Sequence, residues 1–107
     1  MLARSIAEAG RQPTRSVIRA SRSIDPGIAQ VWSIPFFAGS LAEIGLMGDG
    51  KADLDLAIAD AEGRALCLDS GPSDRALCSL RPVENQTYTI TVTNRSETAA
   101  SYSLLIN

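Results

Sequence analysis

Hydrophobic and polar side chains alternate along much of this chain, most clearly near its middle. Leu54, Leu56 and Ile58 occupy every second position. Asp53 directly precedes Leu54, and Asp55 lies between Leu54 and Leu56. Successive side chains of a β-strand point to opposite faces of its sheet. The aliphatic residues therefore share one face and the two aspartates share the other. This pattern predicts a strand with one buried face, followed by a tight turn.

Similar short patterns recur along the chain with turn residues between them, which is typical of an all-β sandwich or barrel. The predicted strands cover residues 14–20, 29–37, 41–47, 54–60, 65–69, 75–80, 87–94 and 99–106. We expect the strands 41–47 and 54–60 to pair as neighbours. We also expect 65–69 and 75–80 to form a hairpin, because the five residues between them are rich in turn formers.

Aromatic residues follow the same alternation. Trp32, Phe36, Tyr88 and Tyr102 fall at core-facing positions of predicted strands, so we expect them in the core and not in a polymer-binding stripe. Phe37 falls on the opposite face beside a turn. It is the aromatic residue that we predict to be exposed and available to contact a ligand.

One proline marks the position of its strand in the sheet. Pro35 lies within the predicted strand 29–37 and has no backbone N–H to donate. We therefore expect this strand to lie at a sheet edge or to bend there.

Charge divides the chain into a basic start and an acidic body. Residues 1–22 carry five arginines and one glutamate, whereas residues 23–107 carry five basic and eleven acidic side chains. We assign residues 1–13 to a poorly structured basic arm and residues 14–107 to a single β-sandwich domain. The arm is interpreted either as a segment that binds an anionic surface or, as we favour, as a flexible leader resting on the acidic body.

The same composition bears on possible partners. The acidic body and the pI of about 5.0 argue against nucleic-acid binding. No apolar run approaches the roughly 20 residues that a membrane-spanning helix needs. The oligomeric state does not follow from the pattern.

The residues present exclude several kinds of catalysis. The chain contains no histidine, so neither a Ser-His-Asp nor a Cys-His centre can form. Its only lysine, Lys51, lies in a glycine-rich turn where nothing is expected to lower its pKa. We therefore predict that the protein is not an enzyme.

Three aspartates form the best candidate for a metal site. Asp49 lies in the Gly-Asp-Gly turn, and Asp53 and Asp55 share one face of the following strand. Clustered carboxylates supply the oxygen ligands that Ca²⁺ prefers, although the spacing is not that of an EF-hand. The alternative is a solvated strand face whose carboxylates bond to the backbone or to a nearby arginine.

The two cysteines, Cys67 and Cys78, lie opposite each other in the predicted hairpin. They form either a cross-strand disulfide in an oxidising compartment or two small buried hydrophobic residues in a reducing one.

Several motifs in a fixed order resemble the bacterial pre-peptidase C-terminal domain. In order, the motifs are Ala38-Gly39, Gly48-Asp49-Gly50, Asp53-Leu54-Asp55-Leu56 with Asp60 and Gly63, Tyr88-Thr89-Ile90-Thr91-Val92-Thr93-Asn94, and Tyr102-Ser103-Leu104. The resemblance covers roughly residues 19 to 107. It implies a jelly-roll-like β-sandwich that is not catalytic and is usually appended to secreted proteases or other exported enzymes. Some members bind calcium, and some bind collagen or other extracellular polymers.

Taken with the resemblance, these features predict a non-catalytic binding or accessory module of a secreted or periplasmic protein. An exported location favours the disulfide between Cys67 and Cys78. The alternative function is a structural or assembly role in which the chain associates with itself through sheet edges.

Overall fold

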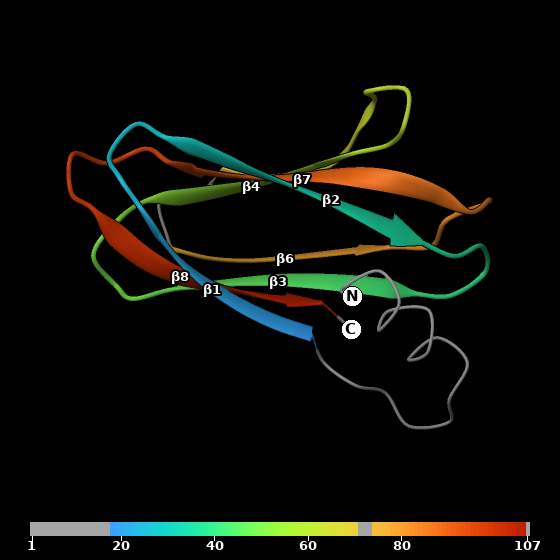
Figure 1. Cartoon of the computed structure of the whole chain (residues 1–107), viewed down its shortest axis with the longest axis horizontal. Helices are drawn as coiled ribbons and strands as arrows, with labels where there is room; N and C mark the ends of the chain where they lie inside the picture. Colours follow the sequence, from blue (N-terminus) through green and yellow to red (C-terminus); the bar gives the residue numbers. More distant parts are fainter. Residues whose placement is uncertain (1–17, 71–73, 107) are drawn as a thin grey trace.

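The structure is a computed structural model that describes residues 18–70 and 74–106, and it consists of eight β-strands (Figure 1). The strands are β1 (Ile18–Ile24), β2 (Ala29–Phe36), β3 (Ala42–Gly48), β4 (Leu54–Ala59), β5 (Ala65–Asp69), β6 (Arg75–Leu80), β7 (Gln86–Asn94) and β8 (Ala100–Ile106). The predicted arm, residues 1–13, lies outside the described residues. The first strand was predicted at 14–20, but its described part continues to Ile24.

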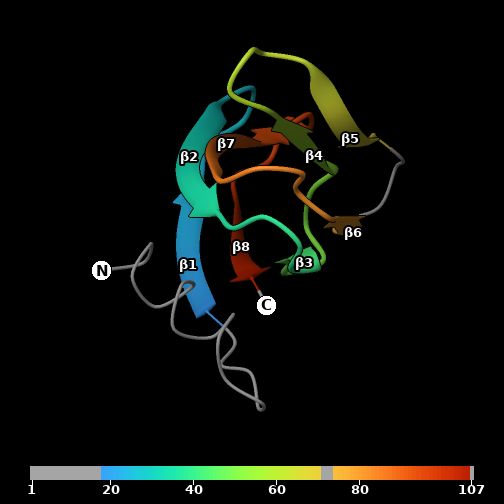
Figure 2. The ribbon, with the colours of Figure 1, turned by 90° about the vertical axis from the view of Figure 1, so that its right-hand side faces the viewer.

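The strands form two four-stranded antiparallel sheets packed face to face (Figure 2). The first sheet has the order β1-β8-β3-β6, and the second has the order β2-β7-β4-β5. β1 pairs with β8, β2 with β7, β3 with β6, and β4 with β5, as in a long hairpin rolled into two layers. This is the jelly-roll arrangement of a β-sandwich, so the predicted fold class is confirmed.

Two predicted strand pairings are wrong. β3 and β4 lie in different sheets, and so do β5 and β6. Each of these pairs is joined by a connection that crosses from one sheet to the other. Alternation shows which face of a strand is buried, but it does not show which strand lies beside it. The expected edge position of β2, with Pro35, is confirmed.

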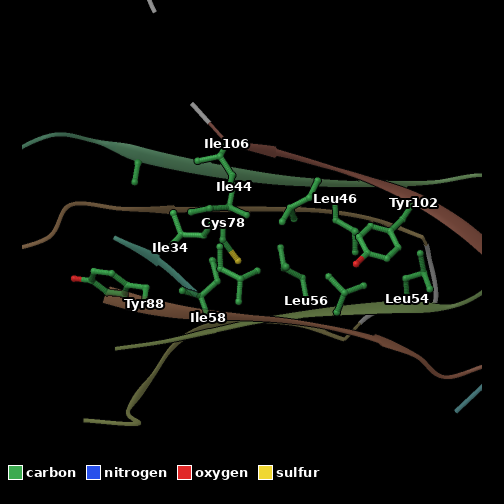
Figure 3. Close-up of a cluster of buried hydrophobic side chains, with 14 of the residues drawn as sticks. Ile34, Ile44, Leu46, Leu54, Leu56, Ile58, Cys78, Tyr88, Tyr102 and Ile106 are labelled. Carbon is green, nitrogen blue, oxygen red and sulfur yellow. The ribbon is translucent and has the colours of Figure 1, made fainter. Parts of the chain in front are cut away.

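The core lies between the two sheets and is aliphatic at its centre (Figure 3). Its fully buried side chains include Ile44, Leu56, Ile58 and Ile90, which alternate inward from three strands. Phe36, Tyr88 and Tyr102 are also buried, as predicted. Burial of this apolar surface is the main force that holds the two sheets together.

A polar residue, Asn94, is buried where β7 ends. Its amide donates to the backbone carbonyls of Ile24 and Thr98, at 3.2 and 2.9 Å. Its side-chain oxygen accepts from the backbone N–H and the hydroxyl of Ser96, at 2.9 and 2.8 Å. All four hydrogen-bonding positions of the side chain are occupied, so this one residue ties the end of β1 to the turn before β8.

Candidate functional site

The three aspartates of the predicted metal site have separate partners. The Asp49 carboxylate accepts the backbone N–H of Ser101 at 3.0 Å and that of Lys51 at 3.1 Å. The bond from Ser101 is the main reason that the pKa of Asp49 lies below its usual value. Asp49 is thereby tied to the start of β8.

Asp53 and Asp55 lie instead beside an arginine from the turn after β7. The Arg95 Nε atom is 2.8 Å from Asp55 Oδ2, and the Arg95 backbone N–H donates to the Asp53 carbonyl. The alternative interpretation placed Asp55 on a solvated face bonded to a nearby arginine. The arginine is present, but Asp55 is only 6% exposed. Within residues 18–70 and 74–106, no three acidic or cysteine side chains gather closely enough to hold a metal ion.

Each of these two carboxylates nevertheless has one buried oxygen without a hydrogen-bond partner. The atoms are Asp53 Oδ1 and Asp55 Oδ1. Two such oxygens make up only part of the six to eight that Ca²⁺ takes. The residues therefore fit a calcium ion only if water or backbone carbonyls complete its shell.

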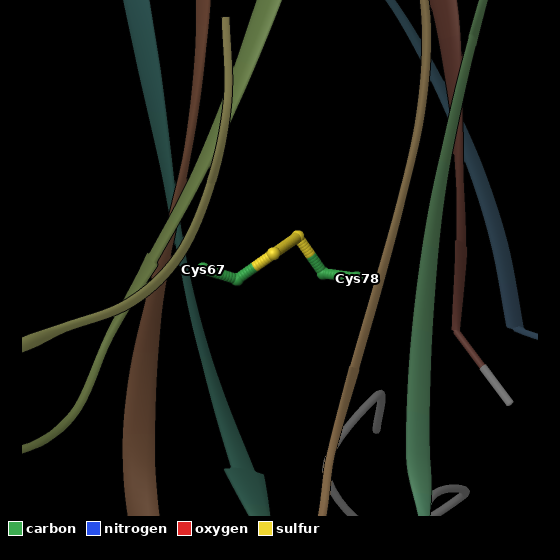
Figure 4. Close-up of a disulfide and its surroundings, with 2 residues drawn as sticks. All are labelled: Cys67 and Cys78. Carbon is green, nitrogen blue, oxygen red and sulfur yellow. A yellow bond between two sulfur atoms is a disulfide. The ribbon is translucent and has the colours of Figure 1, made fainter.

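The two cysteines form a disulfide, Cys67–Cys78, with their Cα atoms 6.1 Å apart (Figure 4). The predicted bond is thus present, but it does not span a hairpin. It joins β5 of the second sheet to β6 of the first, so it closes one flank of the sandwich across the core.

Phe37 follows the last residue of β2 and is 37% exposed, as predicted. No other feature of the described structure assigns it a ligand, so its role as a contact stays a prediction.

A groove that the sequence analysis did not find lies on the opposite flank, where β1 and β2 form the two sheet edges. Arg22, Gln30, Val31 and Trp32 line it, and it is a shallow, open depression with a volume of about 310 Å³. We call it the flank groove. The Arg22 guanidinium lies 4.8 Å from the centre of the Trp32 ring, which is the distance of a cation–π contact.

A chain of hydrogen bonds fixes the groove from beneath. The Trp32 indole N–H donates to the Tyr102 hydroxyl at 3.1 Å, and that hydroxyl donates to Gln30 Oε1 at 2.7 Å. The Gln30 amide then donates to the backbone carbonyl of Ser23 at 2.9 Å. Burial raises the pKa of Tyr102, so its hydroxyl stays protonated and able to donate.

The local sequence explains how this groove forms. In β1, Arg22 shares the inward-facing parity of Ile24, and in β2, Trp32 shares that of Ile34. Both strands are sheet edges, so these inward side chains reach the open margin of the sandwich. Trp32 is therefore only partly buried, whereas we predicted it in the core. The alternation of Ala20, Arg22 and Ile24 is the signal that could have revealed Arg22, but the predicted first strand ended at residue 20.

A second hollow, of about 480 Å³, lies between the β4–β5 turn and the β6–β7 loop. Asp60 lies in its wall and accepts the backbone N–H groups of Glu62 and Arg64 at 3.0 and 2.9 Å. The Arg64 Nε atom is 2.9 Å from its other oxygen. Burial opposes the charged form of Asp60, but these bonds outweigh it and hold its pKa below the usual value. Asp60 thus stabilises the β4–β5 turn, and both of its carboxylate oxygens already have partners there.

Comparison with solved structures identifies the fold, whereas comparison of the sequence identifies no family. No family model matches the chain, and no curated protein matches it significantly. Among solved structures, it resembles the pre-peptidase C-terminal domain of a Bacillus anthracis collagenase. The TM-score is 0.67 at 12% identity, over 84% of this chain and 88% of that one.

Two other solved structures are also similar. The Aeromonas hydrophila protein PliG, a periplasmic inhibitor of g-type lysozyme, gives a TM-score of 0.58 at 14% identity, over 85% of this chain and 84% of that one. The Yersinia pseudotuberculosis-derived mitogen gives a TM-score of 0.62 at 12% identity, over 86% of this chain and 85% of that one. Identities this low define the fold alone, and at that level the resemblance to the pre-peptidase C-terminal domain is confirmed. Among the residues that the structure describes, no helix has the length and apolar character to cross a membrane.

Proposed function

We propose that this protein is a non-catalytic binding module of an exported bacterial protein, and that it binds an extracellular polymer in the flank groove. The observation that carries the proposal is the contact of Arg22 with Trp32 above the buried hydrogen-bond chain. Such a chain holds the indole and the Gln30 amide in place before any ligand arrives, which lowers the entropic cost of binding.

The groove chemistry favours an acidic polysaccharide. The exposed guanidinium of Arg22 can form two parallel hydrogen bonds with a carboxylate or a sulfate. The apolar face of a sugar ring packs against an indole, and the Gln30 amide can bond to hydroxyl groups. In this arrangement Arg22 swings from Trp32 to the acidic group as the sugar takes its place over the ring.

Two observations support the other parts of the proposal. The missing histidine removes the commonest general base, which favours a binding role over catalysis. The Cys67–Cys78 disulfide favours an oxidising compartment, and one structure of similar fold is a periplasmic inhibitor.

Co-sedimentation with insoluble polymers tests the proposal. Cross-linked polygalacturonate, uncharged cellulose and gelatin beads serve as acidic, neutral and protein probes. We expect the wild type to bind polygalacturonate most tightly and Arg22→Gln to lose at least ten-fold in affinity, about 1.4 kcal/mol. Arg81→Gln removes an exposed arginine far from the groove and is the matched control. Equal binding by Arg22→Gln and the wild type would contradict binding in the flank groove. Weaker binding by Phe37→Ala would show that the polymer also contacts the end of β2.

Calcium stabilisation is a separate proposal, supported by the unpartnered oxygens of Asp53 and Asp55. A ligand that binds only the folded state raises the thermal midpoint. We expect a higher midpoint in excess calcium than in chelator, and no difference for Asp53→Asn/Asp55→Asn. Equal wild-type thermal midpoints in calcium and in chelator would contradict the proposal that calcium stabilises the fold.

A further inference from the structure

The four edge strands of the sandwich differ in how they discourage pairing with another strand. Native edge strands commonly carry a proline, a bulge or a charged side chain that blocks such pairing. β2 contains Pro35, β5 has a register shift against β4, and β1 carries Arg22. β6 pairs with β3 in unbroken register over its whole length, and its interior residues Ala76 to Ser79 contain neither charge nor proline.

We propose that β6 is a docking edge for a second copy of this chain. In this pairing the two β6 strands run antiparallel about a two-fold axis through Leu77. Leu77 then lies opposite Leu77 of the second copy, and Arg75 lies opposite Ser79. Residues paired in this way share a face, so the first sheets of both copies join into one continuous sheet.

An apolar row supports this register. Leu77 is 66% exposed on the outer face of the first sheet. Beside it in the ladder lies Gly45 of β3, and beyond Gly45 lies Leu105 of β8. Because Gly45 has no side chain, the β3 residue paired with Leu77 does not cover it, and Leu77 stays exposed. Leu77 of a second copy would cover it. The apolar row formed by Leu77, Gly45 and Leu105 would then meet the same row of the second copy at the two-fold axis.

Opposite charges support it as well. Glu43 of β3 is the ladder neighbour of Ser79. The proposed pairing brings Arg75 of the second copy to the other side of Ser79. The long arginine side chain can then reach Glu43 across the small serine, and symmetry repeats this contact. A two-fold axis through Cys78 would instead place Arg75 opposite Arg81, and like charges directly opposite are unfavourable.

This surface is independent of the proposed ligand site. β6 and the flank groove lie on opposite flanks of the sandwich (Figure 2). Pairing through β6 therefore leaves the groove open, and a pair of copies presents two grooves to one polymer. The failure of either proposal leaves the other standing.

Sedimentation of the full chain from micromolar to millimolar concentration tests the docking edge. We expect the wild-type mass to rise from one copy to two and stop there, because each copy has one such edge. Leu77→Lys should remain a single copy with an unchanged thermal midpoint, since Leu77 is exposed. Leu68→Lys is the matched control, because Leu68 is 67% exposed on β5 of the same flank, and it should pair as the wild type does.

Charge reversal gives a second, independent readout. Glu43→Arg should weaken pairing, and the double variant Glu43→Arg/Arg75→Glu should restore it. A wild type that stays a single copy at every concentration overturns the proposal. So does pairing that Leu77→Lys leaves intact, or pairing that the double variant fails to restore. If Leu77→Lys does not fold, the charge-reversal series decides.

Discussion

Asn94 shows how much a single buried polar residue does in this fold. It is 0% exposed, and its side chain makes hydrogen bonds to Ile24, Ser96 and Thr98. Removing the amide leaves two carbonyls and an N–H without this partner. Buried groups left unsatisfied in this way cost more than the bonds themselves contribute.

We predict that Asn94→Ala lowers the free energy of unfolding by about 2–3 kcal/mol. The thermal midpoint should fall by about 10 °C or more. Asn85→Ala is the matched control, because exposed Asn85 accepts one bond, from the Ala38 N–H, and should cost less than about 1 kcal/mol. Equal midpoints for the two variants would show that the buried bonds do not hold the β1 and β8 ends together.

Asp60 links the stability of the β4–β5 turn to pH. Its folded-state pKa is lowered, so its charged form contributes stability that is present above the unfolded value of about 3.9. That contribution is lost as the pH falls through the folded pKa. Asp60→Asn has no such charge, so its urea midpoint should fall less than that of the wild type between about pH 6 and pH 3.

The matched control for this titration lies in the same turn. Glu62→Gln removes a carboxylate that is 60% exposed and should retain the acid sensitivity of the wild type. Parallel acid curves for the wild type and Asp60→Asn would contradict the role given to Asp60.

At the residue scale, the sequence predicted inward positions better than it predicted polar partners. Tyr88, Tyr102 and the aliphatic residues alternate inward as expected, because alternation is a local property of the backbone. The burial of Asp55 was not predictable, because its partner Arg95 is distant in sequence. The contact of Arg22 with Trp32 depends in the same way on which strands form the sheet edges.

At the element scale, the strands were predictable and their neighbours were not. The described strands lie close to the predicted ranges, apart from β1. A turn-rich segment such as residues 70–74 favours a change of direction, but a hairpin and a crossing between sheets both satisfy it. The disulfide was expected across a hairpin that does not exist, and it was favoured because of the resemblance to exported modules. It forms because the two edge strands on one flank also face each other across the core.

The disulfide should stabilise the flank formed by β5 and β6. It closes a loop with a sequence separation of 11. In the chain-entropy account, a loop of this size contributes about 2–3 kcal/mol. We predict that Cys67→Ala/Cys78→Ala lowers the urea midpoint accordingly, and that reductant lowers the wild type to a similar value. Reductant should leave the double variant unchanged, and a wild type indifferent to reductant would contradict this role.

At the scale of the whole molecule, fold and function follow from different evidence. The alternation predicted an all-β sandwich or barrel, and the resemblance of the ordered motifs to the pre-peptidase C-terminal domain implied the jelly-roll-like arrangement. Identities of 12–14% to structures of the same fold show that different sequences share it. The groove depends on a few side chains from two edge strands, and these come together only in three dimensions.

The measurement that tests the account most directly is the fluorescence of Trp32, the only tryptophan in the chain, during titration with polygalacturonate oligosaccharides. Because Trp32 lines the flank groove, we expect a sugar that replaces Arg22 over the indole to change its emission. The account predicts a saturable change that Arg22→Gln weakens at least ten-fold and Arg81→Gln leaves unaltered. Binding by calorimetry with no change in Trp32 emission, or no binding at all, would contradict it.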